Sequence, residues 1–219
     1  MVVKYLFEEH NMLTYTLDKN KEEILLDENN AQVMMAWEKP YMEACIDKLQ
    51  PNGNVLEIGF GMGYSATQIQ KYNPKSHTII EMDPVVIKRL KKWAKNYNNI
   101  IIVEGIWQKE LHKLGKFDEI FFDDFPLYTP KNDMQKSSLI ERFPMFIDLC
   151  RYNHSNPNTK ISGYIDDPLG AFKKRMIEST YYKYKEYTID IPISDNCKYH
   201  RDNKGIIPII SYLYTGDTA

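Results

Sequence analysis

The sequence predicts an α/β fold built on a Rossmann-like, doubly wound sheet. Two observations support this prediction. From Asn54 onward, short apolar runs alternate with segments in which apolar residues recur at helical spacing, as in proteins whose helices cover both faces of a parallel sheet. The first apolar run leads into a turn with glycines at positions 59, 61 and 63. A glycine-rich turn between a strand and a helix is the place where such sheets bind nucleotide-like ligands.

The composition fits one globular domain without a strongly charged surface. The chain has 219 residues, of which 43% are hydrophobic, and this is enough to bury a core. Its formal net charge is -2, so we expect neither nucleic acid nor a membrane as a partner. The three cysteines and five histidines lack the spacing of a disulfide framework or a metal site. No secretory signal is evident, and the expected location is the cytoplasm.

Seven strands are expected along the chain. Five of them form the parallel part of the sheet, at residues 55–58, 78–81, 100–104, 119–123 and 160–165. Two more, at 187–193 and 206–214, follow near the end. Between the strands, apolar residues at helical spacing predict buried helix faces: Val86, Leu90 and Trp93 or Ala94, and then Phe143, Phe146 and Ile147.

Two segments carry no clear period. Residues 154–159, HSNPNT, are a cluster of turn-forming types and are expected to form a turn before the fifth strand. Residues 1–32 are polar and rich in Asn, Glu and Lys. We interpret them as an N-terminal lid or tail, with residues 33–219 forming the main domain.

The glycine turn indicates a small ligand that is not a pyrophosphate. Residues 54–65 read NVLEIGFGMGYS, and Tyr64 stands where a dinucleotide fingerprint needs its third glycine. Glu57 precedes the first glycine by two residues. A carboxylate there disfavours a phosphate and suits a ligand that carries a cationic amino group. Taken alone, the glycines are equally compatible with a structural loop.

Acidic residues follow several strands, at the edge where doubly wound sheets bind ligands. Glu81, followed by Met82 and Asp83, is placed to accept both hydroxyls of a ribose, or else is a solvated turn carboxylate. Trp107, with Ile106, either packs on a purine or belongs to the core. Asp123 ends an apolar strand and is the catalytic candidate, whereas Asp124 is interpreted as a helix cap or a turn residue.

The order of these motifs resembles guanidinoacetate N-methyltransferase, a class I S-adenosylmethionine (SAM) methyltransferase, and the related arginine δ-N-methyltransferases that act on protein. The resemblance covers residues 33–212. By composition alone, residues 33–42 would be an amphipathic helix. The blocks that carry the resemblance are V-M-x-x-W-E-x-P-Y-M, V-L-E-I-G-F-G-M, I-I-E, E-G-I-W, F-x-D-x-F-P-L and Cys197-Lys198-Tyr199.

The resemblance implies a seven-stranded sheet of order 3-2-1-4-5-7-6 and SAM as the cofactor. It implies that Glu38 and Asp123 hold the guanidinium of the acceptor, and that Met34 lies at the acceptor site. The residues that it assigns to the cofactor are Met42, Glu57, Gly59, Phe60, Gly61, Met62, Gly63, Tyr64, Ser65, Glu81, Met82, Asp83, Ile106, Trp107 and Asp123.

The chemistry of these residues is consistent with that role. Two carboxylates can bind the planar array of N–H groups of a guanidinium and orient one nitrogen. We expect Asp123 to act as the general base and Glu38 as its orienting partner. Aromatic rings such as Phe60, Trp107 and Phe125 would keep water out.

One departure from the family concerns the acceptor. Guanidinoacetate methyltransferases bind the acceptor carboxylate with backbone N–H groups of the loop after the fifth strand, and here that loop carries Asp166 and Asp167. Either these carboxylates bind a longer or more cationic acceptor, such as arginine, agmatine or a protein arginine, or they cap the helix that follows.

Because no added recognition domain is visible, a small guanidino molecule is the expected acceptor and a protein arginine the alternative. Two other activities stay open. An aminopropyltransferase also carries paired aspartates after its fourth strand, although Glu57 and the tryptophan-glutamate pair argue against it. The third possibility is a SAM-binding module without catalysis.

Overall fold

The computed structural model describes residues 12–125, 139–167, 169–200 and 202–213. Within them, seven strands form one mixed sheet in the order β6-β5-β4-β7-β8-β10-β9. Numbered along the sheet's own chain order, this is 3-2-1-4-5-7-6, so the predicted fold class and strand order are confirmed. The strands are β4 (Asn54–Ile58), β5 (Ser76–Glu81), β6 (Ile100–Glu104), β7 (Phe117–Phe122), β8 (Ser155–Gly163), β9 (Tyr182–Asp190) and β10 (Lys204–Tyr212).

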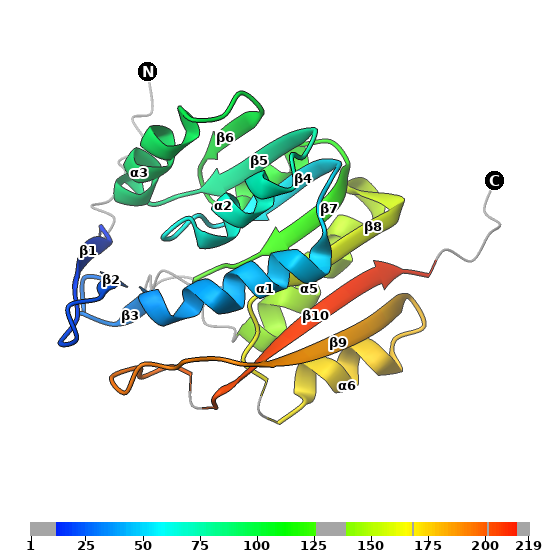
Figure 1. The fold of residues 1–219 in the computed structure, drawn as a ribbon. Coiled ribbons are helices and arrows are strands. Elements are labelled where there is room, and N and C mark those ends of the chain that lie inside the picture. Colours follow the sequence, from blue (N-terminus) through cyan, green and yellow to red (C-terminus); the bar gives the residue numbers. More distant parts are fainter. Residues whose placement is uncertain (1–11, 126–138, 168, 201, 214–219) are drawn as a thin grey trace, which may run out of the picture.

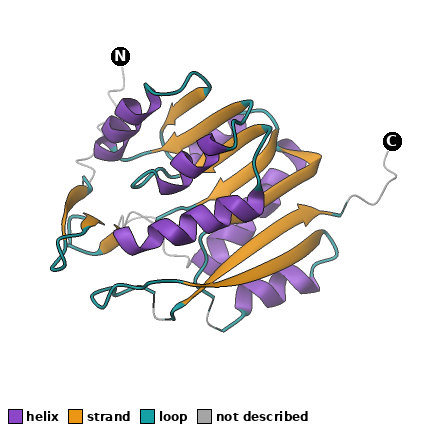
Figure 2. Ribbon diagram, viewed as in Figure 1, coloured by secondary structure: helices purple, strands orange, loops and turns teal. Residues whose placement is uncertain are grey.

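Helices cover both faces of this sheet and give three layers (Figures 1 and 2). The helices are η1 (Ala36–Glu38), α1 (Lys39–Leu49), α2 (Tyr64–Lys71), α3 (Pro84–Ala94), α4 (Trp107–Glu110), η2 (Leu111–Lys113), α5 (Leu139–Asn153) and α6 (Ala171–Glu178). Neighbouring strand residues point to opposite faces: Val55 joins the core under α1, α2 and α3, whereas Leu56 joins the core under α4, α5 and α6. The apolar runs of β4, β5 and β7 are therefore buried on both sides, whereas the run of the edge strand β6 is not, since Ile101 is 51% exposed.

Several strand boundaries differ from the prediction. The predicted turn at 154–159 is wrong, because β8 already begins at Ser155, opposite Phe117 of β7. The pairing register shifts between Phe117 and Glu119, and the Thr159 hydroxyl donates to the Phe117 carbonyl. The turn-forming residues therefore lie in an irregular part of the strand and do not end it. β9 begins earlier than expected, at Tyr182, because β10 pairs with it along its full length.

Residues 33–42 form a strand end followed by a helix. Val33 belongs to β3 (Gln32–Met35), and helical structure starts only at Ala36. β3 pairs with β2 (Glu23–Leu26), which pairs with β1 (Thr14–Leu17), so the predicted boundary at residue 32 cuts through a small antiparallel sheet. Residues 1–11 of the predicted lid, Pro126 and Leu127 of the F-x-D-x-F-P-L block, and Tyr214 of the last predicted strand lie outside the described residues.

The small sheet is attached to the main domain at two places beside the tips of the parallel strands (Figure 1). On the β5 side, Arg89 of α3 forms two hydrogen bonds to Glu23, at 2.6 and 3.0 Å, and the Tyr15 hydroxyl donates to the Gly61 carbonyl at 2.6 Å. On the other side, Gln32 donates to the Asn196 carbonyl in the loop between β9 and β10. The small sheet thus bridges the glycine turn and that loop.

A search of the described helices for a stretch long and apolar enough to cross a membrane finds none.

The tight contact between β7 and β8 generates a stability prediction. A Cβ at Gly163 would lie 2.3 Å from the Phe122 carbonyl oxygen and 2.9 Å from the Phe143 ring, so Gly163→Ala must displace backbone. We expect a loss of about 2 kcal/mol in the free energy of unfolding, measured by urea denaturation. Gly115→Ala is the matched control, because a Cβ there meets nothing within 4 Å. Equal stability of both variants would contradict the prediction.

Candidate active site

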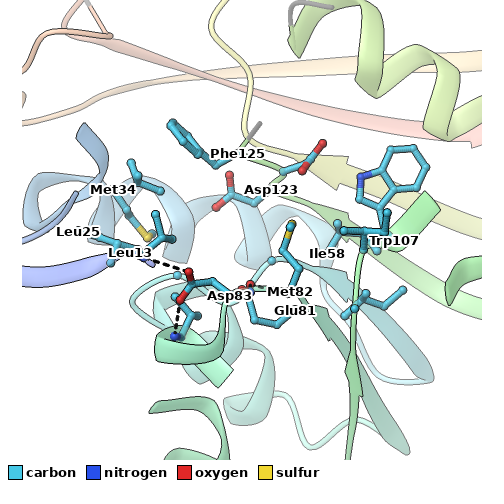
Figure 3. Close-up of a pocket in the computed structure, with 18 of the residues that line it drawn as sticks. Leu13, Leu25, Met34, Ile58, Glu81, Met82, Asp83, Trp107, Asp123 and Phe125 are labelled. Carbon is cyan, nitrogen blue, oxygen red and sulfur yellow. Dashed lines mark hydrogen bonds between the residues drawn. The ribbon is translucent and has the colours of Figure 1, made fainter. Parts of the chain in front are cut away.

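A pocket of about 870 Å³, partly open to solvent, lies at the carboxyl ends of the parallel strands. Figure 3 shows Met34 and Leu13 on one side of it and Trp107 on the other, with Asp123 between them. The main domain contributes the ends of β4, β5 and β7 and the segment after β6, while Leu13, Leu25, Val33 and Met34 come from the small sheet and the residue before it. The pocket is therefore formed by the two parts of the chain together.

The glycine turn allows the backbone of β4 to approach its neighbours closely. Gly59 has a φ of +81°, and a Cβ on it would lie 2.2 Å from the carbonyl oxygen of Asp123. Gly61 has a φ of +49°, and a Cβ there would lie 2.7 Å from the sulfur of Met34. Side chains are excluded by this geometry as well as by the backbone conformation. Both glycines line the pocket, as predicted for a ligand-binding turn.

Glu81 lies at the pocket with its carboxylate held in place by backbone. Its oxygens accept hydrogen bonds from the N–H groups of Phe60, Met82 and Asp83, at 2.7 to 2.9 Å. Burial raises the pKa of Glu81, and these three N–H groups act against that rise. Asp83 beside it caps α3 and also accepts from the N–H of Leu13 at 3.0 Å.

Trp107 combines the two interpretations that the sequence left open. Its ring packs at right angles on Phe122 and Phe146, and the side chain is only 4% exposed, as in a core residue. The same side chain lines the pocket. Its indole N–H is buried and has no partner among the described residues. An unpaired buried donor at a pocket wall is costly unless a ligand or water accepts from it.

Glu57 does not line the pocket. It is fully buried, where its carboxylate accepts a hydrogen bond from the Ser65 hydroxyl and lies 2.8 Å from Nε2 of His77. Both carboxylate oxygens are engaged in this way. The carboxylate therefore ties the start of α2 to β5, beneath the glycine turn.

Asp123 lies just beyond the end of β7, with its N–H donating to the Ile58 carbonyl at 3.0 Å. Among the described residues, no ion pair reaches it. Burial is the main cause that raises the pKa of Asp123 to about 7, and the negative charges of Glu57, Asp124 and Glu81 add to the shift. A carboxyl group in this state would ionise readily beside a bound cation.

Glu38, at the end of η1, is 4% exposed. Its Oε1 accepts hydrogen bonds from the N–H of Met35, at 2.8 Å, and from the Tyr199 hydroxyl. Burial, and then the charge of Asp123, raises the pKa of Glu38 to about 8, which places the two carboxylates close enough to repel each other. The described residues supply no hydrogen bond to Oε2, so one oxygen stays available to a ligand.

Two side chains near the carboxylates were not singled out by the sequence analysis. Arg142 of α5 lines the pocket and binds Asp124, with Nε 3.0 Å from Oδ2 and Nη2 3.0 Å from the Asp124 carbonyl. Asp124 is therefore an ion-pair partner of Arg142. Tyr199 holds Glu38. It belongs to the Cys197-Lys198-Tyr199 block, so that motif was visible, but its contact with residue 38 depends on the fold.

The other predicted site residues divide into two groups. Met34, Met82 and Ile106 line the pocket, and the Met34 sulfur accepts from the N–H of Met62 at 3.3 Å. The predicted residues that do not line it are Glu38, Met42, Glu57, Phe60, Met62, Gly63, Tyr64, Ser65, Asp166 and Asp167. Met42 lies on α1 and is fully buried, and Phe60 packs on Trp93.

Asp167 acts as the cap of α6 and not as an open ligand group. Its carboxylate accepts from the N–H groups of Ala171 and Lys173, at 2.8 and 3.1 Å, in keeping with the capping alternative. Asp166 is half-buried, and its charge acts on Tyr164 next to the carboxylate pair. The residue that follows, Pro168, lies outside the described residues.

Comparison with known proteins was made by sequence and by structure. The profile of a family described as guanidinoacetate N-methyltransferase matches residues 11–148. Protein arginine N-methyltransferase 2 of Candida glabrata is 34% identical over 199 residues, which cover 87% of this chain and 45% of that protein. Its namesake from Saccharomyces cerevisiae is 36% identical over 115 residues, 49% of this chain and 28% of that protein. The chain spans less than half the length of these curated relatives.

Solved structures share the fold at low sequence identity. Spermidine synthase from Thermotoga maritima superposes with a TM-score of 0.61 and 17% identity, over 92% of this chain and 72% of that one. Precorrin-6y C5,15-methyltransferase from Geobacter metallireducens has a TM-score of 0.53 and 13% identity, over 78% and 87% of the two chains. Both support the fold alone.

The raised pKa of Asp123 predicts how stability depends on pH. The folded state keeps a proton on this carboxyl up to about pH 7, whereas the unfolded chain releases it near pH 4, so folding loses stability as the pH rises between these values. Asp123→Asn removes this loss. The unfolding free energy of Asp123→Asn minus that of wild type should therefore be about 3 kcal/mol larger at pH 8 than at pH 5.

Urea denaturation at both pH values measures this difference. Glu178→Gln, at an exposed carboxylate on α6, is the control that should follow wild type. If Asp123→Asn and wild type showed the same pH dependence of stability, the pKa of Asp123 would not be raised in the folded state.

Proposed function

Because the chain belongs to the guanidinoacetate N-methyltransferase family, we propose that it transfers a methyl group from SAM to the guanidinium of an arginine side chain in a protein. The relatives named protein arginine N-methyltransferase 2 favour a protein acceptor over the small molecule expected from the sequence. That expectation relied on the lack of a recognition domain. The lack of a recognition domain no longer supports a small-molecule acceptor, because this chain spans less than half the length of those relatives.

The observation that carries the proposal is the buried pair of Glu38 and Asp123. Both carboxylates lie out of water and without an ion pair among the described residues, and burial raises the pKa of each. The charge of Asp123 adds to the rise at Glu38, while the charges of Glu57, Asp124 and Glu81 add to the rise at Asp123. A cation that binds between them relieves both the burial cost and the repulsion. A guanidinium suits this position, because it stays charged and donates several hydrogen bonds in one plane.

The pocket next to this pair suits SAM. Glu81 is held so that its remaining lone pairs are available to ribose hydroxyls, and Trp107 with Ile106 offers an apolar wall and an unpaired N–H donor to a purine. Gly59 and Gly61 line the pocket without side chains, so a ligand there can approach the backbone of the turn. Glu57 would act through the position of the glycine turn, since its oxygens are engaged with Ser65 and His77.

SAM, when bound, supplies an activated methyl group on its sulfonium. The residues of the chain position the acceptor: Glu38, oriented by Tyr199 and the Met35 N–H, holds one side of the guanidinium, and Asp123 holds the other. Asp123 accepts the proton that the attacking nitrogen loses as its new bond to carbon forms. The ion pair of Arg142 with Asp124 partly neutralises the neighbouring carboxylate, so that Asp124 competes less for the cation.

The loop after β8 favours an acceptor without a carboxylate near its guanidinium. Asp166 adds a negative charge beside Tyr164, and Asp167 already receives N–H groups of α6. Guanidinoacetate would bring its own carboxylate into this negative field, whereas an arginine in a peptide brings neutral amides. The family name keeps guanidinoacetate as a second candidate acceptor.

Two other activities stay as alternatives. The fold shared with spermidine synthase is compatible with decarboxylated SAM and an aminopropyl transfer. Calorimetric titration of SAM against decarboxylated SAM separates these cofactors. A SAM-binding module without catalysis would bind SAM but transfer no methyl group to any guanidino acceptor.

Removing either carboxylate should abolish transfer while leaving cofactor binding intact. Asp123→Asn and Glu38→Gln keep the shape of each side chain but remove the charge that binds the guanidinium. We expect kcat/KM for the acceptor to fall about 100-fold or more, measured with SAM labelled in its methyl group. The SAM dissociation constant should change by less than about threefold. Glu178→Gln is the control, and unchanged rates in the two test variants would remove these residues from the mechanism.

The charge of Asp166 predicts the choice of acceptor. An arginine-containing peptide should be methylated with a kcat/KM at least about tenfold above that of guanidinoacetate, because the carboxylate of guanidinoacetate is repelled. Asp166→Asn should reduce this ratio, because it should raise kcat/KM for guanidinoacetate. Parallel assays of the peptide, guanidinoacetate, arginine and agmatine measure it, and a clear preference of the wild type for guanidinoacetate would contradict the prediction.

A further inference from the structure

Tyr164 occupies the position beside Asp123 at the tips of two neighbouring strands. β7 and β8 are parallel, with Phe122 opposite Gly163, and the N–H of Tyr164 donates to the Phe122 carbonyl at 3.1 Å. Residues at matching positions of adjacent strands point to the same face of a sheet. Asp123 and Tyr164 therefore share the face that α1 covers.

Contacts with α1 agree with this placement. The Tyr164 ring meets the Tyr41 ring edge-on, with centroids 5.7 Å apart, and packs with the core beneath α1. Burial raises the pKa of Tyr164 well above its ordinary value, and among the charges that add to the shift are Glu38, Asp166 and Asp123. The phenol is thus neutral and lies near both carboxylates of the proposed acceptor site.

His200 determines which way the Tyr164 hydroxyl points. Nε2 of His200 lies 3.2 Å from the Lys204 carbonyl oxygen, which can only accept, so Nε2 carries a hydrogen. In the neutral ring Nδ1 then has a lone pair, and it lies 3.0 Å from the Tyr164 oxygen. The Tyr164 hydroxyl therefore donates to His200, which leaves the lone pairs of its oxygen for another donor.

We propose that Tyr164 is a third guanidinium-binding residue, whose oxygen accepts an N–H of the acceptor alongside Glu38 and Asp123 while its own O–H donates a hydrogen bond to His200. This inference rests on the proposed function. Two carboxylates alone allow a planar cation to rotate or slide between them. A third acceptor on the same face, fixed by the β8 backbone, restricts the cation to fewer orientations and so helps to select the nitrogen that reacts.

Tyr164→Phe tests the proposal, because it removes one hydroxyl and keeps the ring that packs on Tyr41. With N-acetylarginine amide as the acceptor, KM should rise about tenfold, while the SAM dissociation constant from calorimetry stays within about twofold of wild type. Tyr184→Phe is the matched control. Its hydroxyl also donates one hydrogen bond, to Glu186 at 2.7 Å, but it lies on β9 and its ring packs on Phe172, in the core on the other face of the sheet.

A second variant separates orientation of the hydroxyl from simple packing. In His200→Phe the Tyr164 hydroxyl loses its acceptor and can turn its hydrogen toward Glu38 or Asp123, where it competes with the guanidinium. KM should again rise about tenfold. The double variant should be no worse than Tyr164→Phe alone, because the two residues act as one unit.

The outcomes distinguish the inference from the proposed function. Methyl transfer by wild type together with an unchanged KM in Tyr164→Phe would overturn the inference and leave the function standing. Additive effects of the two substitutions would overturn the role of His200. If wild type binds SAM but methylates no guanidino acceptor, the function fails and the inference fails with it.

Discussion

The structure depends on a constraint of electrostatics: two carboxylates, Glu38 and Asp123, are buried near each other without an ion pair among the described residues. Such an arrangement is unfavourable for folding, because both charges lose water and each repels the other. A fold retains it only where the remaining structure holds the groups in place. The raised pKa values of both carboxyls express this cost. Under the proposed function, a bound guanidinium would relieve this cost.

Backbone contacts provide the stiffness that keeps these groups in place. Asp123 follows β7 directly, and its N–H donates to the Ile58 carbonyl at the end of β4. Gly59 lets the ends of β4 and β7 approach so closely that any side chain on residue 59 would collide with the Asp123 carbonyl. Glu81 is held by three N–H groups, and Glu57 is tied to Ser65 and His77. The carboxylates at the strand tips are thus placed by the rigid centre of the sheet, where position is least variable.

The surroundings of Glu38 are assembled differently, from segments distant in the sequence. Glu38 comes from a short helix after the small sheet, Tyr199 and His200 come from the loop between β9 and β10, and Tyr164 follows β8. The small sheet contacts the glycine turn through Tyr15 and the β9–β10 loop through Gln32.

The sequence by itself determined the sheet and the residues at its strand tips. Apolar runs that alternate with helical spacing predicted the α/β class, and the resemblance to a known family supplied the strand order. The glycine turn, Glu81 and Asp123 could be placed at strand tips because each directly follows or ends an apolar run in the sequence. The features that the sequence did not predict depend on contacts between distant residues. The strand start at Ser155, the small sheet in residues 14–35, the internal partners of Glu57, and the contacts of Arg142 and Tyr199 all depend on residues that lie far apart in the chain. Only the tertiary structure decided them, because a hydrogen bond or a buried charge depends on which side chains meet in space, and local periodicity carries no information about such meetings.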